Sequence, residues 1–162
     1  MIDEGSEIKD DHGITLNAEL IPGAAEVLHE LKNRGYPLCL VADGYWNTYY
    51  NVLGDYGLWD LFDARAVSEK IGVEKPDPRM FIHATKQLGI KQEHYDRVVM
   101  VGNNLERDIK GANKLGMVSV WLDWAPRRSK VPANALETPD YTIKLPFELI
   151  RIIEELEKNV LN

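Results

Sequence analysis

The chain has 162 residues, 44% of them hydrophobic and 28% charged, and its formal net charge is -7. That length can bury one core, and the composition is ordinary for a globular domain. The acidic balance argues against a nucleic-acid partner, because such binding depends on Lys and Arg that neutralise phosphates. No apolar run approaches the ~20 residues of a membrane helix, and the acidic first residues are unlike a signal peptide. We therefore expect a cytoplasmic protein that binds neither nucleic acid nor membrane.

Strand and helix signals alternate along the chain. After Pro22, apolar residues recur at helical spacing up to Leu31, and Gly35 ends the helix. The apolar run at 36–43 predicts a strand buried on both faces, and the single cysteine, Cys39, is interpreted there as a small buried hydrophobe. The further predictions are a helix at 46–53, a strand at 64–67, a helix opened by Asp77 and Pro78, a strand at 97–101, a helix at 105–115, a strand at 117–122, a proline-rich loop at 125–140, a strand at 141–143 and a helix after Pro146.

This alternation predicts an α/β fold of three layers, in which a parallel sheet lies between helices on both faces. No repeat, low-complexity tract or linker divides the chain. One domain is therefore expected.

Three stretches, in order, resemble the haloacid dehalogenase-like (HAD) hydrolases: "PGAAEVLHELKNRGYPLCLVADG", "FDARAVSEKIGVEKPDPRMFIHATKQLGI" and "VVMVGNNLERDIKGANKLGM". The most specific part is "EKPDP" followed by "VGNN" and an aspartate, and the likeness spans about residues 20–156. The resemblance implies a single HAD-like, Rossmannoid domain over 1–162, with a core at 22–158 and a short or degenerate first-motif segment at 1–21. The segment before the core is too short for the family's large cap domain, so an open site is expected.

What the resemblance implies chemically is an Asp nucleophile, a hydroxyl residue that holds the phosphoryl group, a charge-balancing Lys and an acidic pair that binds Mg²⁺. The physical reason is charge. A phosphomonoester and a carboxylate nucleophile are both anionic, so a lysine and a divalent ion are needed to screen their approach. Mg²⁺ prefers hard carboxylate oxygens and retains several waters.

Lys75 in "EKPDP" matches the lysine motif, and two prolines restrain the loop around it. The second motif falls on "VADG", where Ala42 stands at the hydroxyl position and offers no hydrogen bond to a phosphoryl oxygen. Backbone N–H groups and the neighbouring carboxylate remain. The predicted substrate-binding residues are therefore Ala42, Asp43, Gly44 and Lys75.

The metal motif has Asn103 where its first acid is expected, and it retains Asp108. An amide oxygen can coordinate a cation but adds no negative charge, so the affinity for Mg²⁺ should fall. Asn103 is equally suited to a turn that bonds its own backbone. The predicted metal ligands are Asp3, Asn103 and Asp108.

The first motif, which carries the nucleophile, has two candidate positions. The stretch "MIDEGSEI" places Asp3 at the nucleophile position and Gly5 at the general-acid position, and we prefer this alignment. The stretch "KDDHGITL" places Asp11 there, followed by Gly13 and Thr15, but the residues before it make a poor buried strand. Asp3 is therefore the predicted nucleophile.

The strand of the first motif lies in the middle of the family's sheet, so the strands at 37–42 and 97–101 would flank it. An empty position there would leave buried N–H and C=O groups unpaired, at about 1–3 kcal/mol each. We expect residues 1–8 to fill it as a short, weakly hydrophobic strand, or another chain to donate a strand, for example in a homodimer.

Two functions agree with this pattern. The first is a phosphohydrolase that acts on a small phosphomonoester, with Asp3 and Lys75 as catalytic residues and Mg²⁺ as cofactor; halide release without metal is its variant. The second is an inactive module that binds or regulates a protein partner, because Gly5, Ala42 and Asn103 each lack an expected polar group. Metal-dependent turnover separates the two.

The remaining singled-out residues have structural interpretations. The histidines share no ligand spacing. An aromatic group after the 36–43 strand is expected to pack between helices, with a platform for a substrate or partner as the alternative. An arginine pair is expected as solvated charge, with anion binding as the alternative. The histidines are His12, His29, His83 and His94. The aromatic group consists of Tyr45, Trp46, Tyr49 and Tyr50, and the arginine pair is Arg127 and Arg128.

Overall fold

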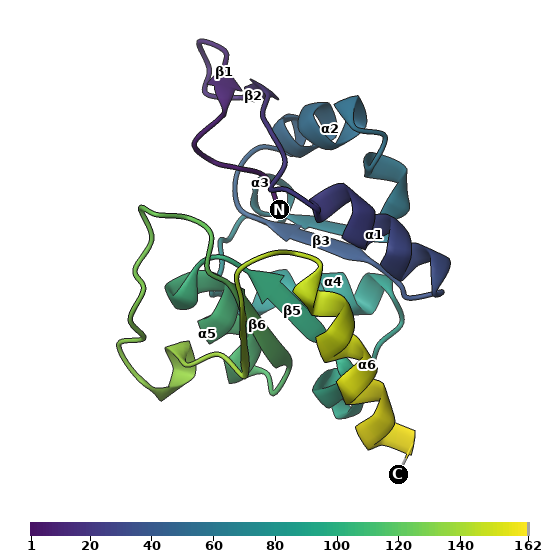
Figure 1. Cartoon of the computed structure of the whole chain (residues 1–162). Coiled ribbons are helices and arrows are strands. Elements are labelled where there is room, and N and C mark those ends of the chain that lie inside the picture. The colour runs from purple at the N-terminus through teal and green to yellow at the C-terminus, as the bar shows by residue number, and fades with distance from the viewer. Residues whose placement is uncertain (162) are drawn as a thin grey trace.

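The computed structural model describes residues 1–161, which Figure 1 colours from the N-terminus to the C-terminus. The strands are β1 (Ile8–Lys9), β2 (Thr15–Asn17), β3 (Cys39–Ala42), β4 (Ala64–Val67), β5 (Val99–Gly102), β6 (Val118–Leu122) and β7 (Tyr141–Ile143). The α-helices are α1 (Ala24–Asn33), α2 (Trp46–Asp55), α3 (Ser68–Ile71), α4 (Pro78–Gln87), α5 (Lys110–Lys114) and α6 (Glu148–Leu161). Shorter helical turns are η1 (Trp59–Leu61), η2 (Gln92–Arg97), the π-helix η3 (Leu105–Ile109) and η4 (Ala135–Glu137).

The middle layer consists of two parallel sheets. β3 pairs with β4, with Cys39 opposite Ala64 and Ala42 opposite Val67. β5, β6 and β7 form the other sheet in that order. Both β3 and β5 are short apolar runs, as is typical of parallel strands that are covered on both faces.

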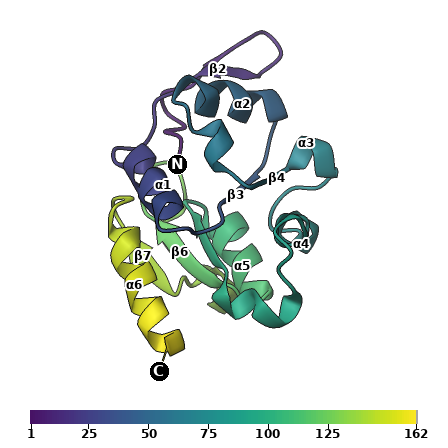
Figure 2. The ribbon, with the colours of Figure 1, turned by 90° about the vertical axis from the view of Figure 1, so that its right-hand side faces the viewer.

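Helices cover the two faces of this layer. On one face, Val27 of α1 and Ile152 of α6 belong to one buried cluster with Val120 of β6. On the other face, Phe81 of α4 shares a cluster with Ala112 of α5. Figure 2 shows α1 and α6 on one side of the strands and α4 and α5 on the other.

Most of the predicted elements are confirmed, and so is the α/β fold with parallel strands and helices on both faces. α4 begins as predicted: the Asp77 side chain accepts a hydrogen bond from the Arg79 N–H, and Pro78 occupies the first turn. The helix predicted at 105–115 starts as the π-helix η3 and continues as α5. The segment before α1 was expected to be too short for the family's large cap domain. Within residues 1–161 this segment contains the β1–β2 hairpin.

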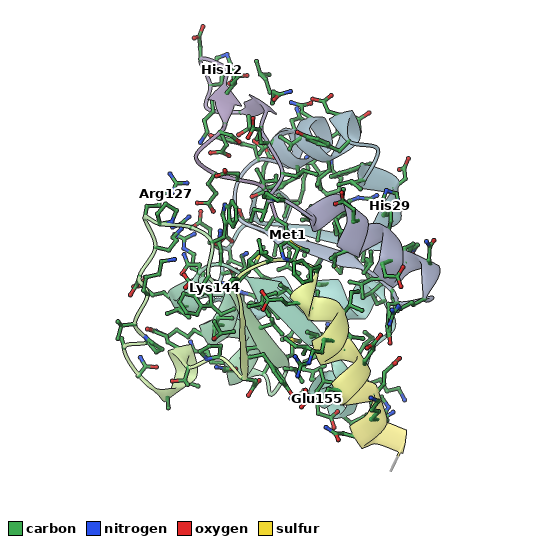
Figure 3. The ribbon with its side chains drawn as sticks, viewed as in Figure 1. Met1, His12, His29, Arg127, Lys144 and Glu155 are labelled. Atoms are coloured by element: carbon green, nitrogen blue, oxygen red, sulfur yellow. The ribbon has the colours of Figure 1, made fainter. Side chains whose placement is uncertain are left out.

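The prediction that residues 1–8 form a strand between β3 and β5 is wrong. Ile2 instead makes an isolated antiparallel bridge with Leu20, and Ile8 lies in β1, which pairs antiparallel with β2. The physical reason is composition. With acidic residues and a glycine among its first eight positions, this segment pairs locally and does not enter an apolar core. Figure 3 shows Met1 beside α1.

Within the described residues, no helix has both the length and the hydrophobicity needed to cross a bilayer. The division of the chain into a first-motif segment at 1–21 and a core at 22–158 stays a prediction.

Candidate active site

A buried ion pair joins two loops that follow different strands. Lys75 lies in the loop after α3, and its Nζ is 2.6 Å from Oδ1 of Asp108, which lies in η3 after β5. The two side chains are 10% and 6% exposed. Lys75 Nζ also donates to the Val41 carbonyl of β3, at 3.0 Å. The carboxyl ends of β3 and β5 therefore meet at one lysine, and ligands of open α/β sheets bind at this kind of edge.

The backbone of Lys75 is anchored as firmly as its side chain. Its N–H donates to Asp43 Oδ1 at 2.9 Å, and Arg107 Nη1 donates to the other oxygen of Asp43 at 3.0 Å and to Glu74 at 3.2 Å. The hydrogen bond from Arg107 to Asp43 raises the pKa of the guanidinium, although burial opposes this. The Lys75–Pro76 peptide bond is cis. Asp43 thus links the loop after β3 to both the lysine loop and η3.

Asp108 is held by the local backbone as well as by the lysine. Its Oδ2 accepts a hydrogen bond from the Asn104 N–H at 3.1 Å. Asn104 Oδ1 in turn accepts hydrogen bonds from the N–H groups of Glu106 and Arg107 in η3. A Cβ on Gly102 would lie 2.2 Å from Asp108 Oδ2. Only glycine leaves room at the end of β5 for this carboxylate to fold back over the strand.

The structure brings some predicted site residues together. Asp43, Lys75 and Asp108 form the network above. Asn103 lines the same cavity as Lys75 and Asp108, and its carbonyl accepts a hydrogen bond from the Trp121 indole at 3.2 Å. The lysine and the retained acid of the motifs therefore lie together, and their roles in catalysis and metal binding stay predictions.

Other predicted residues are engaged elsewhere. Gly44 was expected to offer its N–H to a phosphoryl group, but this N–H donates to Ser68 Oγ at 2.8 Å. Asp3 Oδ1 accepts from the Gly5 N–H at 2.9 Å, which places the carboxylate in its own turn. The cavity that Lys75 and Asp108 line is also lined by Met1, but Asp3 is not among the described residues around it.

The amino group of Met1 lies near the ion pair. Burial lowers the pKa of this amine, and the charge of Asp108 partly opposes the effect. The neighbouring Glu4 accepts hydrogen bonds from Arg127 at 2.5 Å and from Arg128 at 2.9 Å. Although burial raises the pKa of Glu4, these two arginines outweigh it and the net pKa is lowered. The arginine pair, expected as solvated charge, therefore ties its loop to the N-terminal segment.

The aromatic residues after β3 mainly pack α2 against η1. Trp46 and Tyr50 make edge-to-face contacts with Trp59, with ring centroids 5.2 and 5.4 Å apart. Tyr49 is the member that reaches the site, because its hydroxyl donates to the Asp43 carbonyl at 2.5 Å. Burial raises the pKa of Tyr49.

Sequence reasoning missed two residues of the network, Arg107 and Ser68. Arg107 stands in the quoted motif "VGNNLERD", directly before Asp108, and nothing local in the sequence pointed to its partner Asp43. Ser68 directly follows β4. A polar residue just after a parallel strand lies at the ligand-binding edge, and this was its only signal.

Within residues 1–161, neither the histidines nor the acids form a cluster that could hold a metal ion. Figure 3 shows His12 at the tip of the hairpin and His29 on α1, well apart. Asp108 has both carboxylate oxygens hydrogen-bonded, and among residues 1–161 no group of three or more His, Cys, Asp or Glu could hold a metal ion. The described residues alone therefore do not fit the carboxylate-rich site that Mg²⁺ prefers.

Comparison with known proteins places this geometry in a family. Residues 3–116 match the haloacid dehalogenase-like hydrolase family. Glyceraldehyde 3-phosphate phosphatase of Methanopyrus kandleri is 36% identical over 138 residues, which are 85% of this chain and 58% of the relative. Phosphoserine phosphatase of Thermus thermophilus is 32% identical over 124 residues, which are 76% of this chain and 47% of the relative. The chain thus spans about half the length of these curated relatives.

Solved structures agree with the sequence match. The HAD phosphatase from Thermococcus onnurineus has a TM-score of 0.72 at 29% identity, over 84% of this chain and 59% of that one. The HAD-hydrolase YfnB from Bacillus subtilis, solved bound to magnesium, has a TM-score of 0.71 at 30% identity, over 83% and 56%. With a family match over more than half of its residues and relatives above 30% identity across most of its length, this chain belongs to the haloacid dehalogenase-like hydrolases.

Proposed function

We propose that this chain carries the charge-balancing part of a phosphomonoester hydrolase site that takes a small phosphorylated substrate. One observation carries the proposal: the buried Lys75–Asp108 pair at the carboxyl ends of β3 and β5. The names of the relatives from Methanopyrus kandleri and Thermus thermophilus, both phosphatases, support it. Because the chain spans only about half of them, their substrates are not transferred.

In this proposal Lys75 offsets the negative charge of the phosphoryl group. Its ammonium lies in a largely buried position, where its attraction for an anion exceeds that in water. Asp108 positions the ammonium, and Asp43 fixes the loop through the Lys75 N–H. Because three contacts hold the lysine before any substrate arrives, little reorganisation is needed during the reaction.

The nucleophile remains the aspartate proposed from the sequence, Asp3. Its carboxylate would have to release the Gly5 N–H to attack a phosphoryl group held at Lys75. Such a release is inexpensive, since the hydrogen bond is exposed. The magnesium ligands Asp3, Asn103 and Asp108 likewise stay a proposal, which the magnesium bound to YfnB supports. In the described arrangement they do not fit the ion, so they would hold it only after Asp3 leaves the Gly5 N–H.

The test is hydrolysis of p-nitrophenyl phosphate, with and without Mg²⁺, by the unaltered chain and by matched lysine variants. Lys75→Met should lower turnover by about a hundredfold or more, the loss typical of removing one charge-stabilising donor. Lys70→Met removes an exposed lysine of the same stretch and should leave turnover unchanged. Asp3→Asn keeps an oxygen for Gly5, so a loss of turnover there would report on chemistry. Equal rates for the unaltered chain and Lys75→Met would overturn the proposal.

A second function, an inactive binding or regulatory module, is favoured by a specific observation. The N–H of Gly44 is already bonded to Ser68, and Ala42 has no hydroxyl, so two expected phosphoryl contacts are absent among the described residues. This alternative predicts no turnover of phosphomonoesters and no release of halide from a 2-haloacid. Turnover that depends on Lys75 excludes it.

A further inference from the structure

The loop after β6 brings two arginines onto one carboxylate of the N-terminal segment. Arg127 donates from Nε at 3.2 Å and from Nη2 at 2.5 Å to Oε2 of Glu4. Arg128 Nη2 donates to the same oxygen at 2.9 Å. Figure 3 shows Arg127 on this loop, beside the N-terminal segment. Three N–H donors from two guanidinium groups therefore converge on a single oxygen atom.

A fourth donor of this arginine pair has no partner. Arg128 Nε is buried and makes no hydrogen bond within residues 1–161. Nε and Nη2 of a guanidinium group lie on one edge and form a fork that matches two oxygens of one anion. Arg128 uses only half of this fork on Glu4. Because buried donors are almost always paired, the arginine pair suits an anion with more oxygens than a carboxylate has.

A phosphate group matches the arginine pair in shape and in charge. The phosphate of a monoester has three terminal oxygens, so two forks can each bridge a different pair of them, whereas a carboxylate has only one pair. It also carries about two negative charges near neutral pH, which balance the charges of two guanidinium groups. Glu4 balances only one of these charges.

The arginine pair lies at the same edge of the strands as the candidate active site. β6 is parallel to β5, so the loop after β6 leaves the sheet at the edge where Lys75 and Asp108 meet. Glu4 lines the same cavity as this ion pair. Burial lowers the pKa of the N-terminal amine, and the charges of the ion pair and of Glu4 act on it too. The Glu4 carboxylate and the ion pair therefore lie near one another, and one small molecule can contact both places.

We propose that Arg127 and Arg128 form a subsite for the second phosphate group of a small bisphosphorylated substrate, and that the Glu4 carboxylate occupies this subsite until the substrate displaces it. The exchange requires only the Glu4 side chain to turn away. The substrate class rests on the function proposed above for Lys75, whereas phosphate binding by the arginine pair does not. The convergence on one oxygen and the unpaired Arg128 Nε carry the inference.

The first experiment titrates the full chain with inorganic phosphate at constant ionic strength and follows the arginine Nε–H signals by NMR. The Arg127 and Arg128 signals should move together, and the signal of Arg151, an exposed residue of α6, should not. Glu4→Gln keeps the size of the side chain and removes its charge, so it should raise the affinity for phosphate by about tenfold or more. If phosphate moves neither signal in Glu4→Gln, the proposal is overturned.

A matched pair of arginine variants tests the fork. Arg128→Lys keeps the positive charge and loses the second donor of the fork, so the affinity for phosphate should fall by about tenfold. Arg151→Lys makes the same exchange at an exposed position and should leave the affinity unchanged. Equal affinity of Arg128→Lys and the unaltered chain overturns the proposal. The Glu4→Gln titration keeps both arginines, so it decides the question even if Arg128→Lys does not fold.

The second experiment tests the substrate class with a series of alkanediol bisphosphates of increasing length, each compared with the alkyl monophosphate of the same length. Where the length matches the span between Lys75 and the arginine pair, the bisphosphate should bind about tenfold or more tightly than the monophosphate. Arg128→Lys should remove this preference. If no bisphosphate is preferred although inorganic phosphate moves the arginine signals, the pair binds free phosphate only and the substrate class is overturned. A failure of the proposed function looks different, because the arginine signals then respond while no phosphomonoester is hydrolysed.

Discussion

The inner strands β3 and β5 are connected at their carboxyl ends and separate along their lengths. At the ends, Lys75 bonds both Val41 and Asp108, and Arg107 reaches Asp43 from the β5 side. Along the lengths, the backbone pairing that the structure describes for residues 1–161 goes only outward, to β4 and β6. The difference teaches that hydrogen bonds made by the side chains of Lys75, Asp43 and Asp108 hold the two strand ends together without backbone pairing between the strands. The site is therefore assembled even where the sheet is not continuous.

We expect the largest effect from removing the Lys75 ammonium, which connects the carboxyl ends of β3 and β5. Lys75→Met leaves the buried carboxylate of Asp108 without its partner and should destabilise the chain by about 3–5 kcal/mol. Lys9→Met breaks an ion pair whose side chains are 50% and 17% exposed, and it should cost less than about 1 kcal/mol. Urea unfolding of both variants measures the difference. Equal costs would mean that the buried pair does not hold the two ends together.

The free energy of unfolding should depend on pH through Cys39, which lies in β3, away from the connected strand ends. Burial raises the pKa of the Cys39 thiol from 9.0 to about 12. The folded chain therefore keeps a proton that the unfolded chain loses above pH 9, and stability should fall as the pH rises from 9 toward 12, by at most about 1.4 kcal/mol per pH unit. Cys39→Ala removes this contribution. Urea unfolding at pH 8 and pH 10 should show a smaller pH-dependent loss for Cys39→Ala than for the unaltered chain; identical losses would contradict the prediction.

The connected end could be predicted from the sequence because its signals are local. Lys75 stands between prolines in "EKPDP", and Asp108 follows the glycine and amides of "VGNN". Such turns are determined by nearby residues, so they keep their form whatever happens elsewhere. The strands and helices around them were likewise predicted from periodicity, and the structure confirms them.

The N-terminal segment could not be predicted in the same way. Its expected place in the sheet depended on contacts with β3 and β5, far away in sequence, while its own residues favour local pairing. Arg107 and Ser68 were missed for a related reason. Their partners, Asp43 and Gly44, belong to a loop after another strand, and only the three-dimensional convergence of the strand ends brings them together.

A third prediction tests the fit at the end of β5. Gly102→Ala puts a Cβ 2.2 Å from Asp108 Oδ2, and this carboxylate cannot move without losing Lys75 and Asn104. We expect the free energy of unfolding to fall by about 1–3 kcal/mol, the usual cost of overpacking. In Gly54→Ala, in α2, the added Cβ meets nothing within 4 Å, so the free energy of unfolding should rise by about 0.5–1 kcal/mol. Thermal unfolding that shows no difference between the two alanines would contradict the close fit.

The smallest expected effect separates the N-terminal turn from the connected end. The Asp3 side chain accepts one exposed hydrogen bond, from the Gly5 N–H, so Asp3→Ala should cost no more than about 1 kcal/mol. Asp10 provides the matched control, because its Oδ1 accepts from both the His12 and Ile14 N–H groups in the hairpin. Asp10→Ala should cost more than Asp3→Ala, and both should cost less than Lys75→Met. If Asp3→Ala were as damaging as Lys75→Met in urea unfolding, then Asp3 would have to act together with the buried pair, and the N-terminal segment would belong to the connected end of the strands.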